Sequence, residues 1–265
     1  MADDTTAEQR WQALLTGENL DVPVKGLRHA FRLVPSEHRC MFCNSPFDLF
    51  SALVFNMIGK GPSGVSSKFC NICQVESSKF IGGTEIDLTL LFADVRGSTS
   101  LAEGMNPSGF SKIISRFFGV SSKILLESGV RVDRLVGDQI IGMCIPYYVG
   151  GNHQLAVIEA AKALLRATGH DSADGPWIPL GVGVHCGNAF VGTVGSHDAA
   201  TDITVLDDAP NAAAKLLSAA AAGEIMLSDG AYDIAGLTDD LERRTLELKG
   251  KSEPMGVCVL TDISK

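Results

Sequence analysis

Two short stretches of the sequence, LLFADVRGST at residues 90–99 and DRLVGDQIIG at residues 133–142, carry most of its chemical information. Each places an aspartate, Asp94 or Asp138, at the abrupt end of a strongly apolar, strand-like run. If the two strands are neighbours in a sheet, the two carboxylates converge on one point. Paired carboxylates suit hard cations such as Mg²⁺ or Mn²⁺, and two such ions can clamp the attacking and leaving oxygens of an in-line displacement. An aspartate at a strand end is also a common turn or cap residue, so the residue pattern alone leaves both roles open.

The residues that follow Asp94 predict a place for an anion. Gly97-Ser98-Thr99 can turn backbone N–H groups toward a helix start at residues 101–103. Such groups form a small anion-binding nest, which would lie beside the carboxylates.

The hydrophobic pattern around these stretches predicts an α+β domain. Its expected strands are residues 86–95, 130–136, 140–145, 178–185, 189–194, 224–227, 241–248 and 255–260, with a turn at 186–188. Its expected helices are residues 106–128, 153–168, 208–221 and 228–235, and a further helix is expected at 7–15. The order strand, helix, hairpin, helix, strand is that of a ferredoxin-like βαββαβ domain with additions.

The chain is expected to have three parts. Residues 1–35 form an N-terminal helical arm, residues 36–82 a cysteine-rich module, and residues 83–265 the α+β domain. The boundary is placed at the Gly-Gly-Thr of residues 82–84, because paired glycines commonly interrupt regular structure.

Four of the seven cysteines form two Cys-x-x-Cys pairs, Cys40 with Cys43 and Cys70 with Cys73. This spacing is typical of a four-thiolate metal site, which suits Zn²⁺ or an iron–sulfur cluster. The other three cysteines lie singly in apolar stretches and are expected to be small core residues.

Composition excludes some classes of partner. The formal net charge of −9 and the absence of a Lys/Arg cluster argue against nucleic acid. The most apolar run, residues 47–59, is too short to span a membrane, and the acidic N-terminus does not resemble a secretory signal. The protein is therefore expected in the cytoplasm, with no membrane partner.

Six motifs in this order resemble the catalytic core of the class III adenylate and guanylate cyclases. They are LLFADVRGSTSLAE, VDRLVGDQIIGMC, GVGVHCGNAFVGTVGS, DITVLDDAPNAAAKL, GEIMLSD and LELKGKSEP, which lie within residues 85–260. The resemblance implies that residues 83–265 convert a nucleoside triphosphate to a 3′,5′-cyclic nucleotide and pyrophosphate, which is second-messenger synthesis by a phosphorus–oxygen lyase. The cysteine-rich segment resembles modules that precede some bacterial cyclase domains.

The resemblance also implies a role for individual residues. Asp94, Asp138 and the carbonyl of Val95 would hold two Mg²⁺ or Mn²⁺ ions, and the amides of Arg96, Gly97, Ser98 and Thr99 would hold the terminal phosphates. Asn211 would orient the ribose, Lys215 would stabilise charge on the phosphate, Lys249 would contact the triphosphate, and Arg134 and Thr204 would recognise the base. The family's site lies between two protomers, so a homodimer is implied.

Several positions depart from the family pattern. Arg134 stands where adenylate cyclases usually carry Lys, and Lys215 stands where the family has Arg. Arg can donate to a base carbonyl, which adenine lacks, whereas the commonest family member makes cyclic AMP. Residues 207–210, Asp-Asp-Ala-Pro, replace a stretch that usually reads Gly-Asp-x-Val; an aspartate here can cap the next helix and Pro210 fits its first turn.

These departures leave two interpretations open. The site is tuned to another base, as in the pyrimidine (uridylate) cyclases of bacterial antiviral defence, which resemble this family and also alter the base-recognising positions. Alternatively, the domain is a catalytically weakened regulatory or binding module. Both aspartates, Asn211 and Lys249 are present, which favours an active enzyme.

Overall fold

The computed structural model describes residues 6–17, 26, 30–31, 34, 36, 39–40, 42–47, 61–63, 69–79, 81–149, 151–195, 201–247 and 253–264. The chain divides into two compact units. One unit comprises Met1–Ile86 and Phe190–Val205, and the other comprises Asp87–Ala189 and Leu206–Lys265. We call them the N-terminal unit and the cyclase-like unit. The division of the chain at residues 82–84 stays a prediction.

A mixed sheet organises the cyclase-like unit. Its strands are β1 (Gly82–Val95), β2 (Arg131–Val136), β3 (Gln139–Cys144), β4 (Leu180–Gly195), β6 (Ile225–Ser228), β7 (Glu242–Leu246) and β8 (Met255–Leu260), in the order β2-β3-β1-β4-β6-β8-β7. A further strand, β5 (Thr201–Leu206), pairs with β4. The order β2-β3-β1-β4, with helices after β1 and β3, confirms the predicted ferredoxin-like α+β fold.

Helices connect the strands. They are α5 (Ser98–Glu103), α6 (Pro107–Glu127), α7 (Pro146–Val149), α8 (His153–Ala167), α9 (Asp208–Ala219) and α10 (Asp229–Ala235). Of these, α6, α8, α9 and α10 lie where helices are predicted. The start of α6 follows local chemistry, because the Asn106 side chain accepts a 2.7 Å hydrogen bond from the Gly109 amide and Pro107 occupies the first turn. Asn152 caps α8 in the same way, accepting from the Leu155 amide at 3.0 Å.

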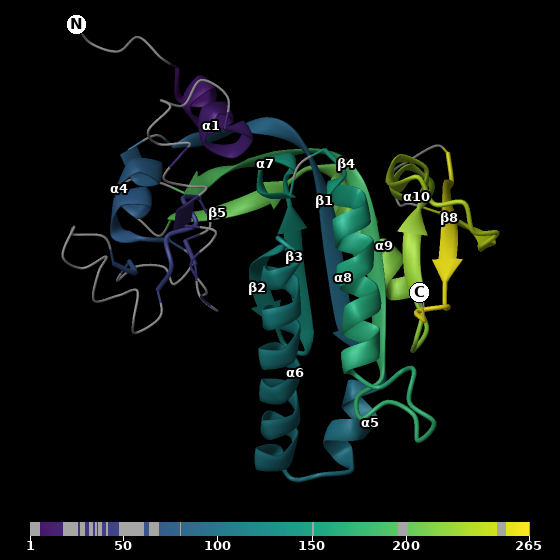
Figure 1. Cartoon of the computed structure of the whole chain (residues 1–265). Helices are drawn as coiled ribbons and strands as arrows, with labels where there is room; N and C mark the ends of the chain where they lie inside the picture. Colours follow the sequence, from purple (N-terminus) through teal and green to yellow (C-terminus); the bar gives the residue numbers. More distant parts are fainter. Residues whose placement is uncertain are drawn as a thin grey trace, which may run out of the picture. The chain divides into compact units, whose positions relative to one another are not determined.

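Apolar side chains cover both faces of this sheet. Helices α6 and α8 lie side by side along the strands (Figure 1), and Phe117 and Leu164 on them pack in one cluster with Leu91 of β1. Along β6 the faces alternate: Ile225 and Leu227 join that cluster, whereas Met226 packs with Leu216 of α9. Helix α9 therefore covers the opposite face.

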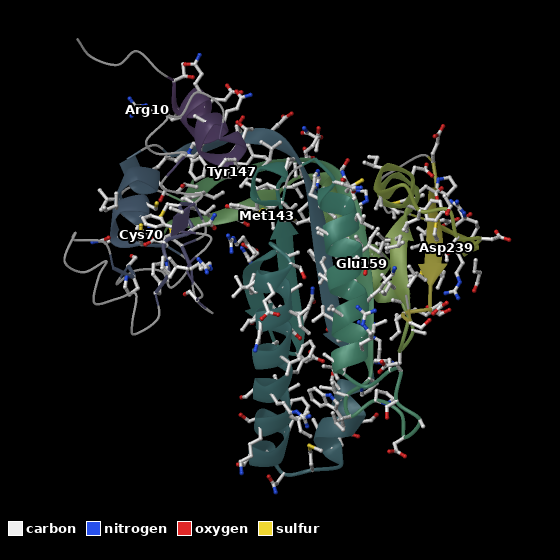
Figure 2. All side chains as sticks on the ribbon, viewed as in Figure 1. Arg10, Cys70, Met143, Tyr147, Glu159 and Asp239 are labelled. Carbon is white, nitrogen blue, oxygen red and sulfur yellow. The ribbon has the colours of Figure 1, made fainter. Side chains whose placement is uncertain are left out.

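The outer surface of α8 is polar where the inner surface is apolar. The Glu159 carboxylate accepts a 2.7 Å hydrogen bond from the ammonium of Lys162, three residues later, and the Glu159 side chain is 45% exposed. On β3, by contrast, Met143 is buried (Figure 2). Residues 142–144 of β3 are all buried, so both faces of this end of the strand are covered.

Within the described residues, the helices of the N-terminal unit include α1 (Ala7–Thr16) and α4 (Asn71–Lys79). Thr6 and Gln9 form a reciprocal capping box at the start of α1, which confirms the helix predicted there. Trp11 of α1 meets the ring of Phe42 at 5.6 Å, and Phe42 meets Phe69 at 4.9 Å. These three buried rings form the aromatic core of the unit.

Two glycines let β1 and β4 approach closely within the N-terminal unit. A Cβ atom on Gly83 would lie 2.4 Å from the carbonyl oxygen of Val191, and one on Gly192 would lie 2.3 Å from that of Gly82. The predicted strand start at residue 86 is accordingly four residues late, because the glycines at 82 and 83 continue the strand instead of ending it.

The structure corrects the prediction of two strands at residues 178–185 and 189–194. A single strand, β4, runs without a turn through Cys186, Gly187 and Asn188. Gly187 does not have the positive φ that a tight turn would require, so the chain stays extended. Helices α4 and α7 and strand β5 were not predicted. Within the described residues, no helix combines the length and apolarity needed to span a membrane.

Candidate active site

The pairing of β1 with β3 brings the two aspartates together. These strands are antiparallel, with Asp94 opposite Gln139 and Ala93 opposite Ile140. Asp138 directly precedes Gln139, in the turn with Gly137, which has a φ of 63°. The two apolar strands are therefore neighbours, and both carboxylates belong to one end of the strand pair.

The charge around Asp94 suits a cation. Burial raises the pKa of Asp94 and the nearby Asp138 raises it further, while Arg96 opposes both effects. One guanidinium nitrogen of Arg96 lies 2.6 Å from a carboxylate oxygen of Asp94, and both side chains are 24% exposed. Two neighbouring carboxylates fit a divalent ion, since hard oxygen ligands are those that Mg²⁺ and Mn²⁺ take.

The segment after Asp94 makes the predicted turn earlier than expected. Gly97 has a φ of 68° and α5 begins at Ser98, not at residue 101. The amide of Arg96 donates to the carbonyl of Pro179 at 2.9 Å, so it is already engaged. The amides of Gly97, Ser98 and Thr99 enter the first turn of α5, where backbone donors lack helical partners.

A β-bulge places an aspartate beside the predicted base-recognising arginine. Val132 pairs with Gly142 and Arg134 pairs with the next residue, Ile141, so Asp133 is the extra residue. The buried Asp133 carboxylate accepts a 2.9 Å hydrogen bond from the Nε of Arg134, whose side chain is 39% exposed. The ion pair of Asp133 with Arg134 could not be predicted from the sequence, because a bulge depends on the partner strand and leaves no local pattern.

Helix α9 carries Asn211 and Lys215 on one exposed face. The two residues are four apart, which places them on the same side of the helix. The opposite face, with Ala213 and Leu217 among its members, is buried. Asp207, one of the two aspartates that could cap the helix, is the N-cap, and its carbonyl accepts a 3.2 Å hydrogen bond from the Asn211 side chain.

Asp207 has a backbone conformation that normally requires glycine. Its φ of 96° and ψ of −159° lie in a region that is almost exclusively occupied by glycine, and such strain costs on the order of 1–3 kcal/mol. The resembling family usually has Gly at this position. Asp207 therefore adopts this conformation at an energetic cost, and its carbonyl accepts the hydrogen bond from Asn211.

We expect Asp207→Gly to stabilise the protein by about 1 kcal/mol, because relief of strain outweighs the lost cap and the added chain entropy. Urea unfolding measures this difference. The matched control is Asp208→Gly, at the first helical residue, where glycine should destabilise by up to about 1 kcal/mol. A destabilised Asp207→Gly variant would contradict the strained conformation.

Within one chain, the aspartate pair and Asn211 lie toward opposite ends of α9. A Cβ atom on Gly181 would lie 2.9 Å from the Arg96 guanidinium and 3.2 Å from the carbonyl oxygen of Ala220, the C-cap of α9. Arg96, which holds Asp94, is thus close to that end. Asn211 precedes Ala220 by nine residues, or about 13 Å along the helix.

Of the two further predicted site residues, Thr204 and Lys249, the structure describes only the first. Thr204 lies on β5 in the N-terminal unit and is half-buried. Lys249 lies outside the described residues. Their predicted roles, like those of the other site residues, stay predictions.

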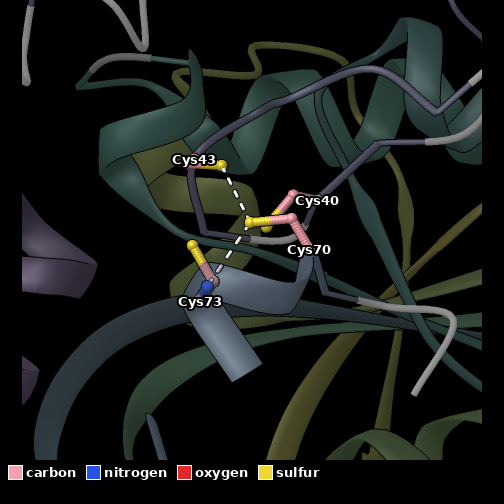
Figure 3. Close-up of side chains that lie close together, drawn as sticks. All are labelled: Cys40, Cys43, Cys70 and Cys73. Carbon is pink, nitrogen blue, oxygen red and sulfur yellow. Dashed lines mark hydrogen bonds between the residues drawn. The ribbon is translucent and has the colours of Figure 1, made fainter. Parts of the chain in front are cut away.

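The four paired cysteines come together in the N-terminal unit (Figure 3). Their sulfur atoms all lie within 4.8 Å of one another, and Cys43 and Cys70 are 3.7 Å apart. Burial raises the pKa of Cys40, whereas hydrogen bonding with Cys40 lowers the pKa of Cys70 to about 7. The pairing predicted from Cys-x-x-Cys spacing is confirmed as a spatial cluster that could bind a metal.

Comparison with known proteins now identifies the family. The model of the adenylate and guanylate cyclase catalytic domain matches residues 84–261, two thirds of the chain. The chain belongs to this family of class III cyclases. An adenylate cyclase of Anabaena cylindrica is 27% identical over 187 residues, covering 64% of this chain and 36% of that protein. An adenylate cyclase of Mycobacterium tuberculosis is 25% identical over 209 residues, covering 77% of this chain and 44% of the relative.

Solved structures support the same fold. The adenylyl cyclase CyaB from P. aeruginosa superposes with a TM-score of 0.58 at 26% identity, covering 67% of this chain and 95% of that one. The guanylyl cyclase Cya2 gives a TM-score of 0.61 at 24% identity, covering 68% and 93%. The chain spans less than half the length of the two curated relatives, so its match to them concerns the cyclase domain.

Proposed function

We propose that this class III cyclase is an active nucleotidyl cyclase, which forms a 3′,5′-cyclic nucleotide and pyrophosphate from a nucleoside triphosphate. The carrying observation is the pairing of β1 with β3, which brings Asp94 and Asp138 to one end of the strand pair. This chain retains both carboxylates of the family's catalytic core, so the residues needed to hold divalent cations are present. A regulatory domain would not need to keep them.

Mg²⁺ or Mn²⁺ held by Asp94, Asp138 and the Val95 carbonyl would activate the ribose 3′-oxygen and neutralise the phosphates. Arg96 must release the Asp94 oxygen that it now contacts at 2.6 Å, which frees its guanidinium to meet a phosphate. The first-turn amides of α5 hold the terminal phosphates. Asn211 orients the ribose, and the Lys215 ammonium balances charge as pyrophosphate leaves.

A homodimer completes the site in this proposal. Asn211 lies about 13 Å along α9 from the end that meets Arg96. A ribose bound beside the aspartates of one protomer would then contact Asn211 and Lys215 of a second protomer. A two-fold axis would create two such sites, one for each aspartate pair.

The ion pair between Asp133 and Arg134 indicates the class of base. A guanidinium carries only donors, and the 2.9 Å bond from its Nε to Asp133 fixes the plane of the group. Such a group suits a base that presents a carbonyl acceptor. We propose that the substrate is a triphosphate of guanine, uracil or cytosine in preference to ATP.

A turnover assay tests the proposal. Purified protein with Mn²⁺ is given ATP, GTP, CTP and UTP separately, and cyclic product is measured by mass spectrometry. We expect one carbonyl-bearing base to dominate, and Arg134→Lys to shift the ratio toward ATP by about tenfold. A folded dimer that makes no cyclic product from any of the four would instead indicate a regulatory or binding module.

A further inference from the structure

The four clustered cysteines of the N-terminal unit lie outside the proposed cyclase chemistry and form a site of their own. We infer that Cys40, Cys43, Cys70 and Cys73 hold one Zn²⁺ ion in a single tetrahedral site. This ion cross-links the two Cys-x-x-Cys segments and stabilises the unit. The inference rests on sulfur geometry, on the local backbone and on the aromatic core beside the cluster.

The sulfur separations fit one ion. With zinc–sulfur bonds of 2.3 Å, the sulfurs of a regular tetrahedron lie about 3.8 Å apart. Cys43 and Cys70 are 3.7 Å apart, and no pair among the four exceeds 4.8 Å. Closing the widest pair requires a movement of about 1 Å, which is within reach of side-chain rotation.

The same distances argue against the other four-thiolate sites. In an iron–sulfur cluster the four thiolates do not all bind the same iron atom. Some cysteine sulfurs are therefore separated by the cluster itself as well as by two iron–sulfur bonds, and lie farther apart than around one ion. A disulfide requires a sulfur–sulfur distance of about 2.05 Å. None of the four cysteines is in a disulfide, and the Cys43–Cys70 separation of 3.7 Å is far longer than a bond.

The backbone is shaped around the cluster at both Cys-x-x-Cys pairs. The amide of Cys73 donates to the sulfur of Cys70 at 3.4 Å, in the first turn of α4. At the other pair, the amide of Asn44 donates to the carbonyl of Cys40 at 3.0 Å, and Asn44 has a φ of 61°. Each of these tight turns directs the two sulfurs of its pair toward one point. The N-terminus of α4 also favours negative charge on Cys70 and Cys73.

The ligands are adjacent to the aromatic core of the unit. Phe42 lies between Cys40 and Cys43 in the chain, and Phe69 directly precedes Cys70. The two rings are 4.9 Å apart, and Trp11 of α1 packs on Phe42. A structural metal bound beside a packed core contributes folding free energy to that core. Metal loss should therefore release α1 as well as α4.

Metal analysis of the purified full-length chain tests the inference. Elemental analysis by mass spectrometry is expected to find one zinc per chain and no stoichiometric iron. Replacement by Co²⁺ should give the intense visible spectrum of a tetrahedral thiolate site. Iron with sulfide, or zinc-free protein with disulfides between these cysteines, would overturn the assignment.

Variants connect the ion to these residues. Cys43→Ser and Cys70→Ser should each lower zinc content at least tenfold and increase hydrogen exchange in α1 and α4. The matched control, Cys186→Ser, changes a half-buried cysteine of the cyclase-like unit and should keep one zinc. Zinc retained in both ligand variants would refute the site. Asp94→Asn should also keep its zinc, so that loss of cyclase activity and loss of the ion are measured independently.

Discussion

Asp94→Asn and Asp138→Asn should each lower the cyclase turnover of the protein by at least about 100-fold. The amide that replaces each carboxylate keeps its shape but loses the negative charge that holds a divalent cation. The β1–β3 pairing should survive, because it depends on backbone hydrogen bonds and on buried side chains such as Phe92 and Ile140. Initial rates with Mn²⁺ measure the loss, and circular dichroism shows whether the fold is kept.

The matched control is Asp87→Asn on the same strand. Asp87 is exposed and accepts a long, 3.5 Å contact from Asn188, so its variant should retain turnover within about twofold. If Asp94→Asn retains activity like this control, the metal-holding role of Asp94 is refuted.

Mixing two inactive variants tests the shared site. Asn211→Ala should be inactive through the loss of ribose contacts, and Asp94→Asn through the loss of cation binding. In a mixed dimer one of the two sites contains neither substitution, so co-expressed chains should recover about one quarter of wild-type activity. No recovery from a mixture that contains heterodimers would contradict a site built from two protomers.

The sequence indicated both aspartates as candidates because their signal is local. An apolar strand that ends in aspartate can be recognised from a few residues, and the same holds for the helix cap, for which Asp207 and Asp208 were both candidates. The bulge at Asp133 could not be predicted, because it depends on which residues of β3 lie opposite. Strand β4 was divided in two because Gly187 and Asn188 favour a turn locally, whereas pairing with neighbouring strands keeps them extended.

The same limit applies to α4. Its sequence, NICQVESSK, has weak helical periodicity, and its first turn is organised by the cluster of cysteines. A helix that depends on contacts with residues about 30 positions earlier leaves little trace in its own sequence. The Cys-x-x-Cys spacing therefore indicated the cluster but not the helix that carries half of it.

Gly183→Ala should destabilise the protein by about 1–3 kcal/mol and lower turnover at least tenfold. Gly183 lies on β4 beneath α9, and a Cβ atom there would be 2.4 Å from the amide nitrogen of Leu217 and 2.8 Å from the carbonyl oxygen of Ala213. Both contacts are to helix backbone, so no side-chain rotation can relieve them. The helix must move away from the sheet, and Asn211 and Lys215 move with it.

Gly119→Ala provides a control of opposite sign. Gly119 is exposed on α6, and a Cβ atom there would meet no described atom within 4 Å outside its own helix backbone, so alanine should stabilise that helix by up to about 1 kcal/mol. Urea unfolding and initial rates are measured for both variants. A Gly183→Ala protein that equals wild type in stability and turnover would show that α9 does not pack this closely on β4. If it unfolds more easily while Gly119→Ala is stabilised, the position of α9, and with it the placement of Asn211, depends on the missing side chain at Gly183.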